Sequence, residues 1–145
     1  MEDWIKGFHE QHMQGKRAKH PTIPAYAIPK SKFNDSTANG LTNWIISYVK
    51  TLKGHTAYIA RINVQGQYRE KLGKWTTSGS TKYVPDIVGV VDDRSIWVEV
   101  KVGRDALSEG QRLAKYNIEQ AGGLFYEAKN MQGFVKWFGQ NFPSK

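Results

Sequence analysis

Two acidic residues and a lysine stand in the middle of the chain at a spacing that could support metal-dependent chemistry. Asp86 follows Pro85, and Glu99-Val100-Lys101 begins after twelve further residues. Neighbouring carboxylates repel each other unless a cation lies between them, and Mg²⁺ is bound by one or two carboxylates with waters and phosphate oxygens. The ion polarises a phosphate and acidifies bound water, while a lysine holds or deprotonates that water. The pattern predicts phosphodiester hydrolysis, although an ordinary charged pair on a solvent-facing strand has the same spacing.

A β-hairpin would bring these residues together. Residues 84–91 and 96–102 are rich in Val and Ile and are separated by Asp92-Asp93-Arg94-Ser95, whose Asp and Ser residues favour turns. Side chains alternate along a strand, so Glu99 and Lys101 share one face. A turn centred in the four-residue segment places Asp86 opposite Lys101 and diagonal to Glu99. We therefore expect both carboxylates and the ammonium group on one face of a sheet.

The remaining segments predict helices and strands around this hairpin. Apolar residues at helical spacing between Leu41 and Leu52 predict a helix that ends at Gly54. Apolar residues at alternate positions from Tyr58 onward predict a half-buried strand, and the polar residues after it predict a loop. The predicted elements are helices at 2–19, 107–121 and 131–142, strands at 57–65 and 124–128, and a loop at 66–83.

The order of these elements predicts the fold class. A helix between the third and fourth strands indicates a crossover, and hence an α/β fold with a mixed central sheet flanked by helices. Three prolines between residues 20 and 29 separate the first helix from the rest. The chain is therefore expected to consist of an N-terminal basic arm and linker, residues 1–35, and one domain, residues 36–145.

The hairpin residues resemble the signature of a known superfamily. Pro85-Asp86 followed by Glu99-Val100-Lys101 is similar to the PD-(D/E)xK nuclease motif, and the element order matches the restriction-endonuclease-like αβββαβ core of that superfamily. The chain is most similar to its VRR-NUC and Holliday-junction-resolvase-like branch, in which a helix with a glutamine follows the motif. Gln111 has that place, and the resemblance covers about residues 36 to 138.

The resemblance implies a Mg²⁺- or Mn²⁺-dependent DNA endonuclease. Asp86, Glu99 and the backbone carbonyl of Val100 would be the metal ligands. Lys101 would be the catalytic lysine, and Gln111 would support the site or its lysine.

One expected ligand is missing from the sequence. Relatives usually carry an additional Glu in the first core helix, yet no acidic residue stands between Asp35 and Glu70. Asn39 and Asn43 lie near the expected place, and an amide oxygen is a weaker, uncharged ligand. The missing acid argues against a complete two-metal site and leaves a one-metal site open, and it also fits a catalytically inactive, DNA-binding nuclease fold.

The positive charge of the chain predicts a polyanionic partner. The net charge is +8, and residues 36–85 hold seven Lys and Arg against Glu70 alone. Duplex or branched DNA is the expected partner, although the same charge would also serve solubility in a protein-interaction domain. The residues predicted to contact phosphates are Arg61, Lys74, Ser78, Ser80, Thr81 and Lys82.

The composition of the chain excludes several classes of protein. The apolar runs are far shorter than the roughly 20 residues of a membrane-spanning helix, so no membrane partner is expected. The chain contains no cysteine, which excludes disulfides and thiol catalysis and fits a cytoplasmic setting. If a four-way junction is the substrate, two symmetric incisions require two active sites, and a homodimer is expected.

Overall fold

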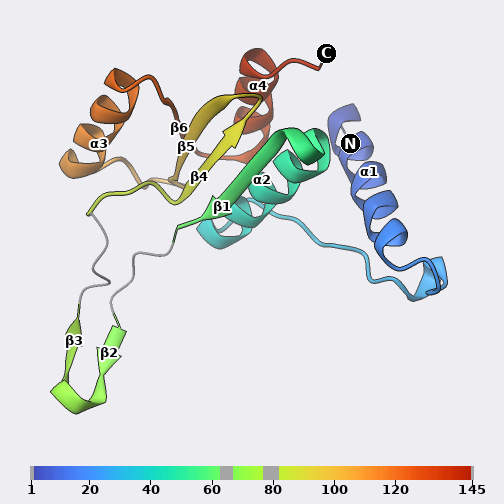
Figure 1. The fold of residues 1–145 in the computed structure, drawn as a ribbon, viewed down its shortest axis with the longest axis horizontal. Helices are drawn as coiled ribbons and strands as arrows, with labels where there is room; N and C mark the ends of the chain where they lie inside the picture. The colour runs from blue at the N-terminus through green and yellow to red at the C-terminus, as the bar shows by residue number, and fades with distance from the viewer. Residues whose placement is uncertain (1, 63–66, 77–81, 145) are drawn as a thin grey trace.

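A four-stranded mixed sheet forms the centre of the protein in the computed structural model, which describes residues 2–62, 67–76 and 82–144 (Figure 1). The strands are β1 (Ala57–Arg61), β4 (Ile87–Val91), β5 (Arg94–Val100) and β6 (Leu124–Ala128), in the order β1-β4-β5-β6. The first three pair antiparallel, and β6 pairs parallel to β5 after a crossover through α3 (Glu109–Gln120). The predicted mixed sheet flanked by helices is confirmed.

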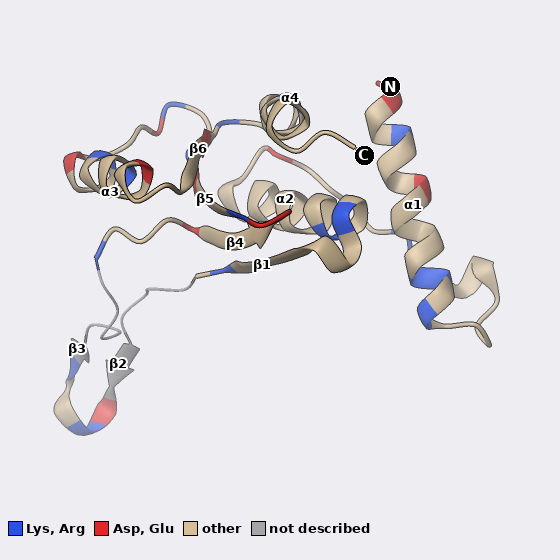
Figure 2. Ribbon diagram, turned by 45° about the horizontal axis from the view of Figure 1, so that its top comes forward, with Lys and Arg blue, Asp and Glu red and all other residues tan. Residues whose placement is uncertain are grey.

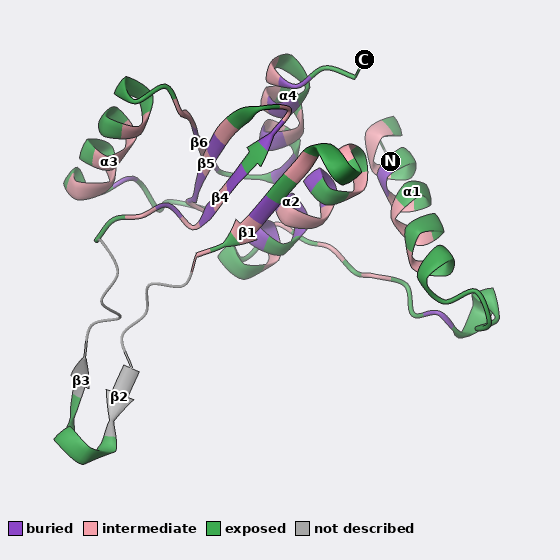
Figure 3. Ribbon diagram, viewed as in Figure 1, coloured by how far each residue is buried: buried purple, intermediate pink, exposed green. Residues whose placement is uncertain are grey.

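Two helices cover one face of this sheet and enclose the hydrophobic core. Helix α2 (Ala38–Lys53) begins after Thr37, whose hydroxyl accepts the Gly40 N–H at 3.0 Å, and ends at Gly54, where φ is +53°. The apolar sides of α2 and α4 (Met131–Asn141) pack on the sheet (Figure 3). The fully buried residues of this core include Leu41, Ile45, Val49, Ile87, Val91, Ile96, Val98 and Phe134.

Helix α1 (Asp3–Lys19) packs beside α2 through one deeply buried ring. Phe8 is 2% exposed, and its ring centroid lies 5.6 Å from that of Tyr48 and 5.2 Å from that of Phe33. After the 3-10 turn η1 (Ala25–Ala27), the chain returns along α1, where Lys16 Nζ donates to the Pro29 carbonyl at 2.5 Å. The helix predicted over 2–19 is confirmed, and a domain boundary at residue 35 stays a prediction.

The opposite face of the sheet is only partly covered. Helix α3 lies over its β5 and β6 side, where Lys115 Nζ lies 5.9 Å from the ring centroid of Phe125. On the other side, Tyr58 of β1 and Val90 of β4 are register partners and are 76% and 51% exposed. Half-burial of β1 is confirmed, but its buried residue is Ile59 rather than Tyr58. Both sides of this strand carry apolar residues, so the sequence pattern did not distinguish them.

The segment between β1 and β4 contains a small hairpin. Strands β2 (Gln67–Arg69) and β3 (Lys74–Thr76) pair antiparallel around the 3-10 turn η3 (Glu70–Leu72), and a second short 3-10 turn, η2 (Gly54–Thr56), precedes β1. The loop predicted for 66–83 is therefore wrong over 67–76, where Tyr68 and Trp75, residue types of high strand propensity, are register partners. The hairpin projects away from the four-stranded sheet (Figures 1 and 2).

Candidate active site

The hairpin of β4 and β5 turns over two residues only. Asp92 and Asp93 have φ angles of +47° and +70°, as a type I′ turn requires, and Val91 pairs with Arg94. The predicted turn, centred between residues 93 and 94, is wrong by one residue. The turn consists of two aspartates at positive φ, a conformation that Asp adopts more readily than Arg, so the residue types favour this turn over one that contains Arg94.

The corrected register places the two predicted carboxylates opposite each other. Ile87 pairs with Val98, so the next residues in the same register are Asp86 and Glu99. Asp86 therefore faces Glu99, and the prediction that it stands opposite Lys101 is wrong. Because the error moves each partner by two residues, every side chain keeps its face. The carboxylates converge, and the Val100 N–H donates to Asp86 Oδ2 at 2.9 Å.

Glu99 is buried and lies beside a second negative charge. Its exposed fraction is 4%. Burial, the hydrogen bond it makes with Asp86 and repulsion from Asp86 raise the pKa of Glu99 to about 8, while Lys101 acts in the opposite direction. At neutral pH the metal-free pair therefore holds a proton, which Glu99 donates to Asp86. A cation placed between the oxygens would reduce the repulsion between the two carboxylates, as that proton does.

Lys101 follows on the same face and is largely enclosed. Its side chain is 12% exposed, and Nζ lies 3.6 Å from Oδ2 of Asp105, four residues further along the chain. Its backbone N–H donates to the Ala128 carbonyl at 2.9 Å, which anchors the end of β5 to β6. The ammonium group is thus held near the carboxylates by an exposed partner, which water and substrate can reach.

Gln111 reaches the same pocket but is engaged in capping α3. Its Oε1 accepts the Ser108 N–H at 2.9 Å, while Ser108 Oγ accepts the Gln111 N–H at 3.2 Å. This is a reciprocal capping box, which satisfies two backbone donors at the helix start. Gln111 therefore fixes where α3 begins beside the site, and its oxygen is committed to that task.

The N-terminal turns of α2 form the facing wall, where the missing acid was expected. Asn39 lines the pocket, and its Oδ1 accepts a hydrogen bond from Arg61 Nη1 at 2.9 Å. Asn43 is exposed and does not line the pocket. Of the two predicted substitutes for the acid, the structure brings only Asn39 to the site, and its oxygen is occupied by a guanidinium group.

These side chains surround an open pocket of about 550 Å³ at one end of the sheet. Among its lining residues are the predicted Asp86, Glu99, Val100, Lys101, Gln111, Arg61 and Asn39. Of the other residues predicted to contact phosphates, Lys82 lines a neighbouring groove and Lys74 lies in the separate β2–β3 hairpin. Ser78, Ser80 and Thr81 lie outside the described residues. Figure 2 shows further basic residues at the end of α1 and of α2, away from the pocket.

Two pocket residues with polar side chains were missed by the sequence interpretation. Asp105 contributes a third carboxylate, and its spacing of four residues from Lys101 could have indicated an ion pair. Thr42 is 3% exposed, and its hydroxyl donates to the Ala38 carbonyl at 2.7 Å. Its place could have been inferred from helical spacing, because Ile45 and Val49 follow Thr42 at i+3 and i+7 on the apolar side of the helix.

The donor set fits one hard divalent cation. Asp86 and Glu99 offer carboxylate oxygens and Val100 a backbone carbonyl, the oxygen ligands that Mg²⁺ and Mn²⁺ prefer. Among the described residues, no group of three or more His, Asp or Glu side chains is placed to hold a metal ion. Two carboxylates with water and phosphate oxygens suffice for Mg²⁺, and the repulsion that raises the pKa of Glu99 would be relieved by a cation.

Comparison of the chain with models of known protein families and with curated proteins found no match. Within the part of the chain that the structure describes, no helix combines the length and the apolar character needed to cross a membrane. The function proposed below therefore rests on the residues of the pocket and the sheet that positions them.

Proposed function

We propose that this protein is a Mg²⁺- or Mn²⁺-dependent endonuclease that hydrolyses DNA phosphodiester bonds, with a restriction-endonuclease-like PD-(D/E)xK core. The single observation that carries the proposal is the buried Glu99 opposite Asp86 in an open pocket that also contains Lys101. Burying a carboxylate beside another carboxylate lowers the stability of the fold unless a cation or a proton lies between them. Pairs of this kind are therefore found mainly at functional sites. The strand order with a helical crossover before β6 is compatible with that core.

Each residue of the pocket would have a different role in hydrolysis. Asp86, Glu99 and the Val100 carbonyl would hold the metal ion, which when bound would polarise the scissile phosphate and acidify water. The Lys101 ammonium would orient the attacking water and neutralise charge that develops on the phosphate. Arg61 would bind a neighbouring phosphate and, through Asn39, keep the wall of the pocket in place.

The wall of the pocket favours a site for one metal ion. A second ion would need further carboxylates on the α2 side, where Asn39 and Thr42 stand. A branched DNA substrate, a homodimer and a cytoplasmic location also belong to this proposal. The first two depend on the similarity to junction-cleaving nucleases, and the third on the absence of cysteine.

A second candidate function is a catalytically inactive nuclease fold that binds DNA. It is favoured by the hydrogen bond between Asn39 and Arg61, because that bond occupies the one oxygen that stands where a catalytic acid is expected. In this case the basic chain would bind DNA with a steep salt dependence and leave it uncut.

Cleavage of a substrate panel distinguishes the two candidates. Plasmid, single-stranded and four-way-junction DNA are incubated with Mg²⁺ or Mn²⁺ and the wild type or the variants Asp86→Asn, Glu99→Gln and Lys101→Ala. We expect each variant to cut at least about a hundredfold more slowly while still binding DNA. Glu119→Gln on α3 and Lys136→Ala on α4 are matched controls, because both residues are exposed and lie outside the pocket.

Two outcomes would contradict the proposal. If the wild type binds every substrate but cuts none with either metal, the protein is the binding module. If it cuts DNA and the pocket variants cut equally well, the active site lies elsewhere.

A further inference from the structure

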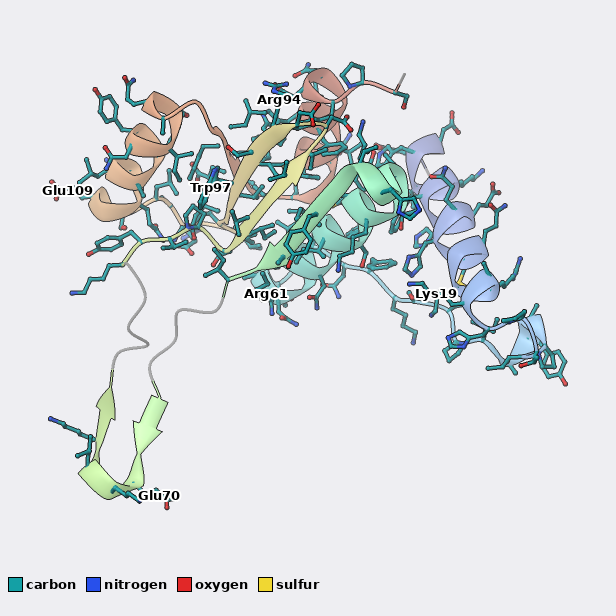
Figure 4. The ribbon with its side chains drawn as sticks, in the orientation of Figure 1. Lys19, Arg61, Glu70, Arg94, Trp97 and Glu109 are labelled. Carbon is teal, nitrogen blue, oxygen red and sulfur yellow. The ribbon has the colours of Figure 1, made fainter. Side chains whose placement is uncertain are left out.

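An apolar groove lies on the partly covered face of the sheet, between β5 and α3. Its volume is about 280 Å³, and we call it the apolar groove. Trp97 of β5 and Leu113 of α3 lie on its two sides, and Figure 4 shows Trp97 between the helix and the sheet. The described residues that line it include Lys82 and no carboxylate. A groove of this kind can bury an apolar group, and Lys82 adds one positive charge to its lining.

The apolar groove adjoins the acidic pocket at three places. Pro85 lines the groove and its neighbour Asp86 lines the pocket. In the same way, Gly110 lines the groove and its neighbour Gln111 lines the pocket. On β5, Trp97 and Glu99 share a face two residues apart, a separation of about 7 Å at the ordinary rise of a strand. A phosphate at the acidic pocket and its own base in the groove are within the span of one nucleotide.

Tyr83 is held at the rim of this groove in an unusual backbone conformation. Its φ is +64°, in the left-handed region that bulky residues rarely adopt, and its side chain is 51% exposed. The ring lies directly on α3, because a Cβ on Gly110 would come within 2.5 Å of it. Glycine at position 110 therefore leaves room for an aromatic ring beside the opening.

Helix α3 leaves the groove open rather than filling it. None of the twelve residues of α3, all of them described, is buried, and Leu113 is 60% exposed. An amphipathic helix normally buries its apolar side, so this one offers apolar surface that the sheet does not use. Asn117 adds an amide to the lining, which can donate to and accept from the edge of a base.

We propose that the apolar groove receives an unpaired nucleobase of the DNA strand whose phosphate lies in the acidic pocket. The inference rests on the proposed function and names its substrate class, which is DNA with an unpaired nucleotide beside the scissile phosphate. Aromatic and apolar walls bind any base through its flat face, and Lys82 suits the neighbouring phosphate. A base in intact duplex must first leave its stack, at an energetic cost, so paired DNA binds less well.

Binding measurements on two matched variants test this inference. Leu113→Glu places a charge in the groove, and Tyr116→Glu places the same charge on the same helix outside it. Both residues are 60% exposed, so neither variant disturbs the core. Tyr83→Asn removes the ring while keeping a residue that tolerates positive φ. Fluorescence anisotropy in Ca²⁺, a hard cation that carboxylates bind, gives the Kd of three duplexes: one with a single unpaired base, one with an abasic residue there, and one fully paired. A gel of the same samples checks that the strands stay uncut.

We expect the wild type to prefer the unpaired base over the abasic and paired duplexes by about tenfold, the scale of one base stacked on aromatic side chains. Leu113→Glu and Tyr83→Asn should remove this preference, and Tyr116→Glu should keep it. If the wild type shows no preference, or if both α3 variants behave alike, the inference is overturned. A change of oligomeric state in Leu113→Glu without a change in DNA preference would indicate a protein surface instead.

The two proposals fail separately. DNA cleavage with unchanged preference in all variants would overturn the base site and leave the nuclease standing. A preference for the unpaired base in a protein that never cuts DNA would leave the base site standing and overturn the nuclease.

Discussion

The two faces of the central sheet differ in what covers them. On one face, α2 and α4 pack on the sheet and residues such as Ile45, Ile96 and Phe134 are fully buried. On the other, α3 buries none of its described residues and the apolar groove opens beside it, while the acidic pocket opens at the end of the sheet, between the start of α3 and the start of α2. We call the face covered by α2 and α4 the closed face and the opposite one the open face. Burial of apolar side chains on the closed face stabilises the fold, whereas the open face keeps polar and apolar groups accessible to a ligand.

The difference shows how a small domain can tolerate a costly site. Glu99 lies on a strand whose alternate residues Val98 and Val100 are buried in the core. The strand is held by its core side, so the side that carries the carboxylate does not need to contribute to stability. Perturbing each face separately tests whether stability and ligand binding are divided in this way.

Removing a large side chain from each face should have very different effects on stability. Phe134→Ala opens a cavity in the closed face and should lower the free energy of unfolding by about 3–5 kcal/mol. Leu113→Ala on the open face should change it by less than about 0.5 kcal/mol. Urea unfolding followed by Trp fluorescence measures both. Similar losses for the two variants would show that α3 is as much a part of the core as α4.

The pH dependence of stability should reveal the buried carboxyl group on the open face. The pKa of Glu99 is raised from 4.5 to about 8 by burial and by Asp86. Between these values the unfolded chain has lost the proton that the folded protein keeps, so the free energy of unfolding of the metal-free protein should fall as pH rises. Glu99→Gln should reduce this fall by an amount on the order of 1–3 kcal/mol.

Urea unfolding of the two proteins in EDTA at pH 5 and pH 8 measures the difference. Parallel pH profiles for the wild type and Glu99→Gln would show that Glu99 ionises normally in the folded protein.

Metal binding should stabilise the protein through one end of the β4–β5 hairpin only. Mn²⁺ at about a hundred times its Kd should raise the Tm by on the order of 5 °C, because it binds the folded state alone. Asp86→Asn should abolish the rise. Asp93→Asn is the matched control, because Asp93 lies in the turn at the other end of the hairpin, where asparagine tolerates its positive φ. Equal Tm shifts in both variants would place the metal elsewhere.

The smallest effect concerns one substitution made on two helices. Gly139→Ala on α4 meets no atom within 4 Å and should stabilise the protein by about 0.5 kcal/mol through helix propensity. Gly110→Ala on α3 meets the Tyr83 ring at 2.5 Å, so this gain should be offset. Thermal unfolding measures both, and an equal gain at both sites would show that Tyr83 is free to leave α3.

Much of the fold could be predicted because its signals are local. The boundaries of α2 follow from Thr37 and Gly54, and those of α3 from Ser108, since capping residues act on the nearest backbone groups. The β2–β3 hairpin was missed because its strands are three residues each, too short for an alternation pattern. The position of the β4–β5 turn was missed because the turn was centred in the four-residue segment, whereas a two-residue turn needs positive φ at both residues and Asp92 and Asp93 tolerate it best.

The candidate site was predictable in its members but not in its geometry. Strand alternation placed Glu99 and Lys101 on one face, and the error in register left Asp86 on that face. The hydrogen bond that occupies Asn39 joins α2 to β1, and no spacing in the sequence indicates it. The apolar groove likewise depends on how far α3 stands from the sheet.

The sequence alone determined the helices and the strands of the central sheet, and that two carboxylates and a lysine share one face of that sheet, because periodicity and capping act over a few residues. The tertiary structure alone decided that Asp86 faces Glu99, that Glu99 is buried enough for its pKa to rise, and that the second face of the sheet stays open. Strand register, the burial of a side chain and the covering of a sheet by helices depend on contacts between residues far apart in the chain. Local sequence patterns do not report such contacts.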